Sequence, residues 1–173
     1  MEPANGFNGA ALADFRCCAC SAAFVISESA PCSEPWSHEV QDHVQQQALS
    51  DAAKGGDDKA DHRLWLLFNG LDLVAAGAHK RLSGRALPSR YITFIAVQSD
   101  NHGKSPDGYP RYADLMLNQL VADARSRDPL IAHVEARVAP ENERSKAFLR
   151  RRGFRIGTVA IAGYLPAALP FLD

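Results

Sequence analysis

The loop from Gln98 to Tyr109 is the first part of the chain whose residues could do chemistry. It carries Gly103, Lys104 and Gly108 and leads directly into an amphipathic stretch. Such a loop presents backbone N–H groups and the positive end of a helix dipole, which suit a pyrophosphate. Glycine lets the backbone come close to a ligand, and Lys104 adds a charge. Many loops carry two glycines only to turn the chain, so this pattern alone is weak.

A second pattern starts at Asn142, continues through Ser145, and ends at Gly153 and Phe154, eleven and twelve residues after the asparagine. A capped helix with a C′ glycine explains these spacings by themselves. The order is more specific, because this helix pattern follows a strand–helix–strand unit whose loop also carries glycine. In this order the residues resemble the signature of the GNAT superfamily of acyl-CoA N-acyltransferases, over residues 64–154.

The resemblance implies a site for acetyl-CoA as co-substrate. In GNAT proteins the two strands that flank the crossover helix splay apart, and the pantetheine arm lies in the gap. Carried over to this chain, backbone groups of Ala96 and Val97 would pair with the arm. Asn142 would hydrogen-bond the arm, with Ser145 close to it. Amides of the loop would hold the pyrophosphate, with Gly103, Lys104, Gly108 and Tyr109 as its binding residues. No metal is expected.

This sequence departs from the GNAT pattern where protons are transferred. The tyrosine that many members carry seven residues after the asparagine, to protonate the departing thiolate, is Leu149 here. The glutamate that some members carry five residues before the asparagine, as a base, is Arg137. The phosphate loop also departs from the compact form of the superfamily, because residues 104–107 separate its two glycines.

A base is still needed, because a protonated amine must lose a proton before it attacks a thioester. A positioned base speeds this step about 10²–10⁴-fold. Glu135 is our catalytic candidate, since it lies two residues from Arg137 and shares its strand face. His79 and His133 have suitable intrinsic pKa values, and a chain of water molecules is a fourth option. These side chains also have structural interpretations without catalysis. Glu135 could simply form an ion pair with Arg137, and His133 could be a core residue whose hydrogen bonds are satisfied within the protein.

The composition sets limits on partners and location. The chain has 173 residues, of which 46% are hydrophobic and 23% charged, and its formal net charge is −1. These values fit one soluble domain with a full core, and the near-neutral charge argues against a nucleic-acid partner. No apolar run approaches the roughly 20 residues of a membrane helix, and the N-terminus lacks a secretory pattern. We therefore expect a cytoplasmic location and no membrane partner.

Four cysteines lie near the N-terminus, namely Cys17, Cys18, Cys20 and Cys32. A zinc site completed by His38 or His43 could be drawn, but a second tight pair of ligands is missing. Residues 17–26 also have the pattern of a strand in which free thiols pack as small hydrophobes. The sequence favours that strand over zinc, and a cytoplasmic location argues against disulfides.

The remaining patterns predict a mixed α/β fold. Strands are expected at residues 17–26, 64–68, 71–79, 91–97, 130–138 and 154–162, and helices at 37–49, 112–125 and 141–149. Asn69-Gly70 predicts a hairpin turn, Gly77 a bulge or a close approach, and Pro166 and Pro170 an irregular C-terminus. The strands joined by helix 112–125 must be parallel.

Together with the resemblance, these elements predict a GNAT-like mixed sheet of six or seven strands with helices on both faces and a splayed parallel pair. We expect one domain over residues 17–165, a flexible N-terminus at 1–16 and a C-terminal tail at 166–173. The expected function is transfer of an acetyl group from acetyl-CoA to a primary amine of a small molecule or protein, with a homodimer as a further arrangement. Two alternatives use the same fold: a degenerate, non-catalytic binding domain, and a toxin that acetylates aminoacyl-tRNA.

Overall fold

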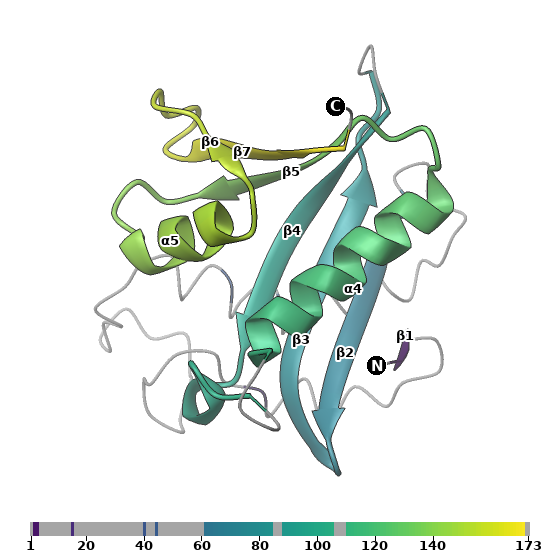
Figure 1. The fold of residues 1–173 in the computed structure, drawn as a ribbon, viewed down its shortest axis with the longest axis vertical. Helices are drawn as coiled ribbons and strands as arrows, with labels where there is room; N and C mark the ends of the chain where they lie inside the picture. The colour runs from purple at the N-terminus through teal and green to yellow at the C-terminus, as the bar shows by residue number, and fades with distance from the viewer. Residues whose placement is uncertain are drawn as a thin grey trace.

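The computed structural model describes residues 2–3, 15, 40, 44, 61–84, 88–105 and 110–171 of the chain. Within these residues a seven-stranded sheet has the order β1-β2-β3-β4-β5-β7-β6 (Figure 1). Its strands are β1 (Glu2–Pro3), β2 (Arg63–Asn69), β3 (Asp72–Arg81), β4 (Ser89–Val97), β5 (His133–Val138), β6 (Arg155–Ile156) and β7 (Leu165–Pro170). The named helices are η3 (Ser99–Asn101), α4 (Tyr112–Arg127) and α5 (Glu143–Arg151). Strands β4 and β5 are parallel and the other described pairs antiparallel, so the expected mixed sheet is confirmed.

The hairpin of β2 and β3 has the predicted two-residue turn, shifted by one position. Asn69 pairs with Asp72, so Gly70 and Leu71 are the turn residues. Gly70 has a φ of +61°, a conformation that glycine adopts at little cost. The returning strand accordingly begins at Asp72 instead of Leu71, and it continues to Arg81.

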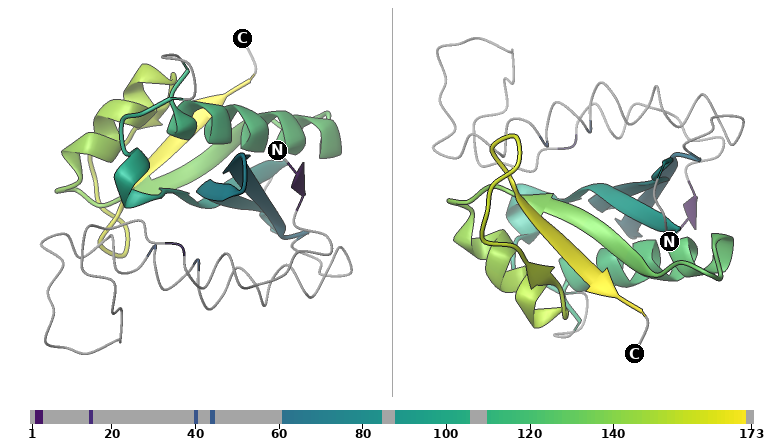
Figure 2. Two further views of the ribbon diagram at one scale, coloured as in Figure 1. Left: turned by 90° about the horizontal axis from the view of Figure 1, so that it is seen from below. Right: turned by 90° about the horizontal axis from the view of Figure 1, so that it is seen from above.

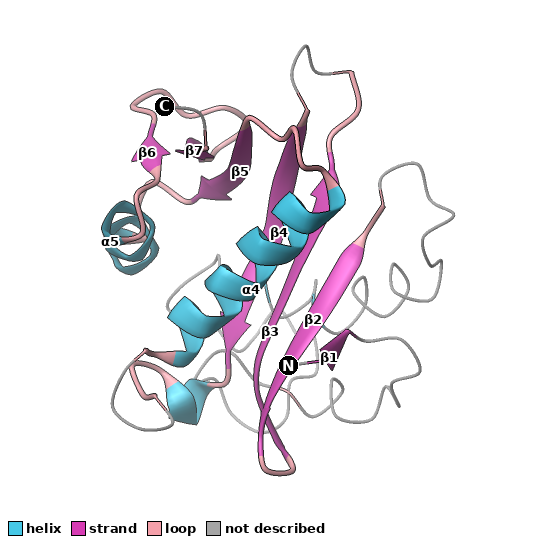
Figure 3. Ribbon diagram, turned by 45° about the vertical axis from the view of Figure 1, so that its right-hand side comes forward, coloured by secondary structure: helices cyan, strands magenta, loops and turns pink. Residues whose placement is uncertain are grey.

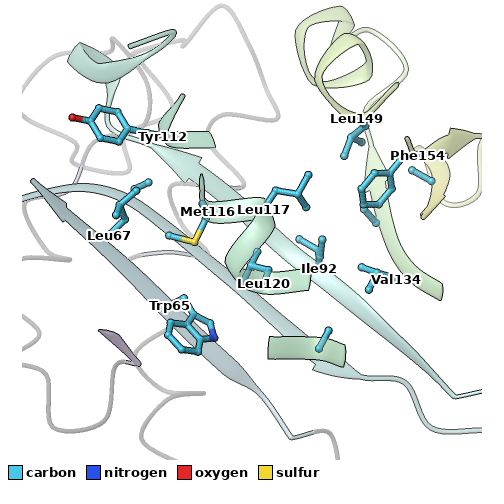
Figure 4. Close-up of a cluster of buried hydrophobic side chains, with 14 of the residues drawn as sticks. Trp65, Leu67, Ile92, Tyr112, Met116, Leu117, Leu120, Val134, Leu149 and Phe154 are labelled. Atoms are coloured by element: carbon cyan, nitrogen blue, oxygen red, sulfur yellow. The ribbon is translucent and has the colours of Figure 1, made fainter. Parts of the chain in front are cut away.

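Helix α4 lies across one face of β2, β3 and β4 (Figures 1 and 3). Gly77 allows this close approach, because a Cβ at this position would lie 2.8 Å from Met116 Cγ and 3.0 Å from Leu120 Cδ1. The expected close approach at Gly77 is therefore confirmed. Helix α5 joins the same face through Leu149 (Figure 2). The main core between these helices and the sheet contains Trp65, Leu67, Ile92, Met116, Leu117, Leu120, Val134, Leu149 and Phe154 (Figure 4).

The opposite face of the sheet carries a second core. Phe94 and Ala96 of β4 pack there with Leu64, Leu66, Leu73, Phe15 and Val44. Val40 packs against the same cluster, and Val40 and Val44 both have helical backbone, which agrees with the helix expected at 37–49. The other residues of that helix, and the expected strand 17–26 with its cysteines, lie outside the described residues. None of the described helices is long and apolar enough to cross a membrane.

Two features bear on the expectation of a flexible N-terminus over residues 1–16. Glu2 and Pro3 pair with Leu66 and Trp65 of β2. Phe15 is buried, with 1% of its surface exposed, among the residues of the second core. At these three positions the chain is held against the sheet by strand pairing and by burial of Phe15.

Strand β7 corrects the expected irregular tail. Residues 165–170 pair with β5 on one side and with β6 on the other. Phe171 donates its N–H to Ala132 O beside β5, whereas Gly157 donates to Pro166 O on the side of β6. Because the N–H and C=O of one residue face the same neighbour in an antiparallel ladder, Pro166 and Pro170 both turn their nitrogens away from β5. Strand β6 is two residues long, so neither proline removes a donor that the ladder needs.

The strand expected at 154–162 is limited to the two residues of β6. Beyond it, Ala162 and Gly163 have φ values of +50° and +81°. Ile161 and Tyr164 exchange two backbone hydrogen bonds around them, of 2.7 and 3.1 Å. The chain thus reverses in a tight turn and places Tyr164 at the start of the segment that enters β7.

A buried charge network ties β3 and β4 to the C-terminal end of α4. Arg90 of β4, which is 1% exposed, donates from Nε to Asp128 Oδ2 at 2.6 Å and from Nη2 to Asp61 Oδ2 at 2.5 Å. Its Nη1 lies 3.2 Å from His79 Nδ1, and His79 Nε2 lies 2.9 Å from Asp123 Oδ2. His79 is therefore enclosed between a guanidinium and a carboxylate.

Protonation in this network follows from burial. Burial lowers the pKa of His79 below its usual 6.5, so the neutral ring donates from Nε2 to Asp123 and accepts from Arg90 at Nδ1. Burial alone would raise the pKa of Asp123, but the hydrogen bond from His79 and the positive charge of Arg63 bring it down to about 2. The carboxylate is thus ionised and the imidazole neutral at pH 7.

Substitution of Gly77 tests the packing of α4. Gly77→Ala should lower the free energy of unfolding by about 1–3 kcal/mol, because the added methyl group displaces Met116 in a filled core. Urea unfolding followed by tryptophan fluorescence measures the change. Met116→Ala opens space beside the strand, so it should cost less in the Gly77→Ala background than in the wild type. An unchanged unfolding midpoint in Gly77→Ala would contradict the close approach.

The pH dependence of stability tests the charge network. The free energy of unfolding should fall as the pH drops below 6.5, because the unfolded chain protonates His79 near that pH and the folded chain only at lower pH. Asp123 should add a loss of about 2 kcal/mol as the pH falls from 3.8 to about 2. Urea unfolding over a series of pH values measures both changes.

His79→Gln provides the matched control for this prediction. Its amide can donate to Asp123 and accept from Arg90, but it does not titrate. The variant should be less stable than the wild type at neutral pH and should lose less stability on mild acidification. Equal pH slopes in the two proteins would show that His79 does not carry the dependence.

Candidate functional site

The parallel strands β4 and β5 separate after a short paired stretch (Figures 1 and 3). Over their fully described lengths they pair only at Ser89 with His133, Arg90 with Val134, and Tyr91 with Glu135. Strand β4 then continues to Val97 and β5 to Val138. The expected splay is therefore present, and it opens toward the ends of the two strands.

A β-bulge in β4 lies where the separation begins. Ile92 pairs with His79 of β3 and Phe94 with Ala78, so Thr93 is an extra residue in β4. A bulge bends its strand and shifts the alternation of side chains. The shift in alternation is present, since Ile92 belongs to the main core and Phe94 to the core on the opposite face, and the pairing with β5 ends at Tyr91, two residues before Thr93. The bulge thus turns the second half of β4 away from β5.

The ladder with β3 determines which backbone groups of β4 face the gap. Gln98 donates its N–H to Val74 O of β3 at 2.9 Å. In an antiparallel ladder, alternate residues make these bonds, so Ala96 also turns its backbone toward β3. Ile95 and Val97 turn theirs toward the gap. The expectation for Val97 fits this geometry, whereas the backbone of Ala96 turns toward β3 and strand parity would have selected Ile95.

A cavity of about 530 Å³ occupies the gap. From the α4 face it is lined by Ile95, Val97, Phe148 and Leu149, and from the other face by Val40, Phe94 and Ala96. The cavity therefore passes between the splayed strands from one face of the sheet to the other. A channel of this form can hold an extended ligand that reaches both faces.

One end of the cavity meets the start of α4. Asn101, His102, Gly103 and Lys104 line it there. Gly103 has a φ of +74° with open space where a Cβ would be, so glycine is needed for the backbone conformation and not for close packing. The Lys104 carbonyl accepts from the N–H of Tyr112 at 3.2 Å, which joins the loop to the first turn of α4.

The start of α4 provides the expected setting for an anion. The first N–H groups of a helix have no partner within the helix and carry the positive end of its dipole. Lys104 and Arg111 add charge beside them, and both line the cavity. Two other expected residues of this loop, Gly108 and Tyr109, lie outside the described residues.

His102 connects this loop to β4 and α5, a role that sequence reasoning missed. Its Nε2 donates to Val97 O at 2.8 Å, and its Nδ1 accepts from Arg144 Nη1 at 3.3 Å. These two bonds require the neutral ring with its proton on Nε2. Nothing in the sequence marks His102 for this role, because the contact depends on how the loop folds back onto β4.

Asn142 and Ser145 lie together at the start of α5. Asn142 Oδ1 accepts from the Ser145 N–H at 2.9 Å and caps the helix. The helix ends at Arg151, and after its C-cap Gly153 has a φ of +86° and Phe154 N–H donates to Leu149 O. The capped-helix interpretation is therefore confirmed. Both Asn142 and Ser145 also line the cavity, where the amide nitrogen of Asn142 is the group that a ligand would meet.

A buried carboxylate fixes α4 against α5 beside the cavity. Asp114 in the first turn of α4 is 1% exposed. Its Oδ1 lies 3.0 Å from Arg151 Nη2 and 3.8 Å from Arg152 Nε. Leaving a buried carboxylate without a partner is costly, so these contacts hold the start of α4 against the C-terminal end of α5.

The proton-transfer candidates lie in different places. Leu149, at the position of the GNAT tyrosine, is buried and lines the cavity, so it provides only apolar surface. Glu135 pairs with Tyr91 at the closed end of the splay, and its Oε1 lies 3.0 Å from His133 Nε2. His79 lies in the buried network under α4, where it is already bonded on both ring nitrogens.

Two tyrosine side chains lining the cavity were not identified from the sequence. Tyr91 lies at the last paired position of β4, and Tyr164 follows the tight turn before β7. Burial raises the pKa of Tyr91, so its phenol stays protonated at neutral pH and can donate a proton. Strand parity with Glu135 and Arg137 could have indicated Tyr91 once the register was known. Among the described residues no group of three metal-ligating side chains is present.

Comparisons with known proteins identify the fold. No protein-family model matches the chain, and no curated protein matches it in sequence. Among solved structures it is similar to PaiA N-acetyltransferase from Thermoplasma acidophilum in complex with coenzyme A, with a TM-score of 0.60 and 11% identity over 79% of this chain and 76% of that chain. An acetyltransferase from Thermus thermophilus gives a TM-score of 0.54 and 22% identity over 71% of this chain and 72% of that chain.

The GNAT domain of S. lividans PAT gives a similar result, with a TM-score of 0.55 and 17% identity over 70% of this chain and 68% of that chain. Structural similarity at such low sequence identity establishes the fold alone and does not identify the acceptor. Together with the splayed parallel pair and the cavity between its strands, they show that the chain has the fold of the GNAT acetyltransferases.

Proposed function

We propose that the protein is an N-acetyltransferase that transfers an acetyl group from acetyl-CoA to a primary amine of a small molecule or protein. The observation that carries this proposal is the cavity between β4 and β5, which begins at the first turn of α4. A neighbour with the same fold was solved in complex with coenzyme A. A cytoplasmic location and a homodimer belong to the same proposal.

The binding mode follows from the groups along the cavity. An amide-bearing pantetheine arm can pair with the backbone of Ile95 and Val97, which β5 leaves open. The pyrophosphate would lie at the first turn of α4 beside Gly103 and Lys104. Asn142, with its oxygen used in the cap, would donate from its amide nitrogen to the arm.

This binding mode directs the thioester toward the closed end of the splay. The neutral amine attacks the thioester carbonyl, the C–N bond forms, and the C–S bond breaks to release the thiolate of coenzyme A. The amine proton leaves to a base, for which Glu135 paired with His133 is our candidate, directly or through water. Tyr91 is protonated at neutral pH and could return a proton to the thiolate.

Acetyl-CoA binding tests the first part of the proposal. Millimolar acetyl-CoA should raise the melting temperature of the protein by mass action. Asn142→Asp keeps the oxygen that caps α5 but loses the amide donor, so it should melt close to the wild type and bind acetyl-CoA more weakly. Asn142→Ala should also lose about 1 kcal/mol of stability with the cap. Thermal shift with and without ligand measures both effects.

The absence of any shift in the wild type would refute the proposal. A shift without thiol release over a broad panel of amines would favour the non-catalytic alternative. Growth arrest on expression, with acetylation of aminoacyl-tRNA, would favour the toxin.

The role of Glu135 is tested by Glu135→Gln. The substitution preserves size and can still bond His133, so acetyl-CoA affinity should stay within about twofold. Turnover should fall about 10²–10⁴-fold if Glu135 accepts the amine proton. His133→Gln is the companion variant, and a smaller loss is expected if His133 only orients the carboxylate. Undiminished turnover in Glu135→Gln would exclude this base.

A further inference from the structure

The acceptor must reach the thioester from the face of the sheet that α4 and α5 do not cover. On the α4 side, the wall of the cavity near the closed end of the splay is apolar, because it is formed by the buried residues Ile92, Ala136 and Leu149. The cavity also reaches the opposite face, where Val40, Phe94 and Ala96 line it. The side chains of β5 on that face therefore meet the acceptor.

Arg137 is the cation of β5 on the acceptor face. Its neighbours Ala136 and Val138 are buried in the main core, and successive strand residues point to opposite faces. The side chain of Arg137 is exposed and lines the cavity. Its Cζ lies 5.9 Å from the centre of the Tyr91 ring, a contact that orients the guanidinium at the closed end of the splay.

Arg137 forms no ion pair with any of the described residues. The carboxylate nearest in sequence, Glu135, instead lies 3.0 Å from His133 Nε2. The described ion pairs of the other arginines involve Asp61, Asp114, Asp123 and Asp128, and none includes Arg137. An oriented, unpaired guanidinium on a cavity wall is suited to bind an anionic oxygen group through two parallel hydrogen bonds.

A second polar group on the wall is also unsatisfied. The hydroxyl of Thr93 is buried and has no hydrogen-bond partner among the described residues. Thr93 is the extra residue of the bulge and lines the same cavity. A buried hydroxyl without a partner is unfavourable, so a polar group of a ligand that bonds to Thr93 would be stabilised at this wall.

We propose that the acceptor is an amine that also carries a carboxylate or phosphate, and that Arg137 binds this anionic group. The inference rests on the proposed acetyltransferase function and specifies its substrate class. The anion would neutralise Arg137 and place the amine beside Tyr91 and Glu135. Cationic polyamines are disfavoured, because they bring further positive charge to the same guanidinium. Arg137 is a binding residue in this scheme and takes no part in proton transfer.

Matched acceptor pairs test the proposal with the full chain and acetyl-CoA. The probes are β-alanine against propylamine, phosphoethanolamine against ethanolamine, the common amino acids against their amides, and spermidine. The kcat/KM from thiol release should be about 10- to 100-fold higher for the anionic member of a pair, the range for hydrogen bonds to a charged group. The carboxylate and phosphate pairs show which anion is preferred.

Variants of Arg137 separate charge recognition from a general loss of activity. Arg137→Gln should lower kcat/KM for anionic acceptors about 10- to 100-fold and leave their neutral partners within about threefold. Arg137→Glu should reverse the preference toward cationic amines. Arg150→Gln is the matched control, since Arg150 is exposed on α5 and does not line the cavity, and it should behave as the wild type.

Three results would overturn the inference: equal kcat/KM within the pairs, an equal loss for anionic and neutral acceptors in Arg137→Gln, or acetyl-CoA binding without turnover of any anionic amine. Thermal shift with acetyl-CoA is run on every variant. Failure of the wild type to bind acetyl-CoA would instead be a failure of the proposed function, so the two outcomes can be distinguished.

Discussion

The extra residue in β4 is the constraint on which the site depends. Thr93 bends β4 away from β5 after three paired positions and reverses the facing of every later side chain. The backbone N–H groups of Ile95 and Val97 and the carbonyl of Ile95 then have no strand beside them, while the Val97 carbonyl accepts from His102 Nε2. Unpaired backbone groups need water or a ligand, and an amide-bearing chain laid along β4 satisfies them. The bulge thus converts part of a sheet into a binding surface without any special side chain.

A gap between β4 and β5 can bind a ligand only if the strands are held together at one end and kept apart at the other. At the closed end, Arg90 lies inside the short parallel ladder and its guanidinium is buried between Asp61 and Asp128. That network ties the ladder to the far end of α4, and breaking a buried pair of this kind costs several kcal/mol. At the open end, Asp114 clamps α4 to α5 through Arg151, while His102 joins Val97 to Arg144. Contacts at the closed end and at the open end therefore both fix the positions of the elements that surround the gap.

The sequence predicted the parts of this arrangement that depend on local pattern. Helix α4, strand β4, the Asn142 cap and the approach at Gly77 each follow from spacing or from one residue type. Strand β7 was not predicted, because Pro166 and Pro170 are residues that usually interrupt a strand. Both prolines are tolerated because their nitrogens face β6, which is only two residues long. Predicting this requires knowledge of the order of strands in the sheet. The bulge at Thr93 and the bond of His102 depend on long-range pairing for the same reason.

The presence of Leu149 in place of the superfamily's tyrosine removes an acid for the thiolate, but this loss has a modest effect on the free energy of acetyl transfer. A thiol has a pKa near 8.5, so releasing a thiolate at pH 7 without an acid costs about 2 kcal/mol. An amine with a pKa near 10.4 costs about 5 kcal/mol to deprotonate at the same pH. The larger requirement is therefore a neutral amine, which a base beside the acceptor meets by accepting the amine proton. Arg137 lies at the closed end of the cavity with Tyr91, so binding of an anionic group there would place the amine of the acceptor close to Tyr91 and Glu135. The chemistry that the GNAT pattern places on α5 would then be carried by the opposite face of β4 and β5.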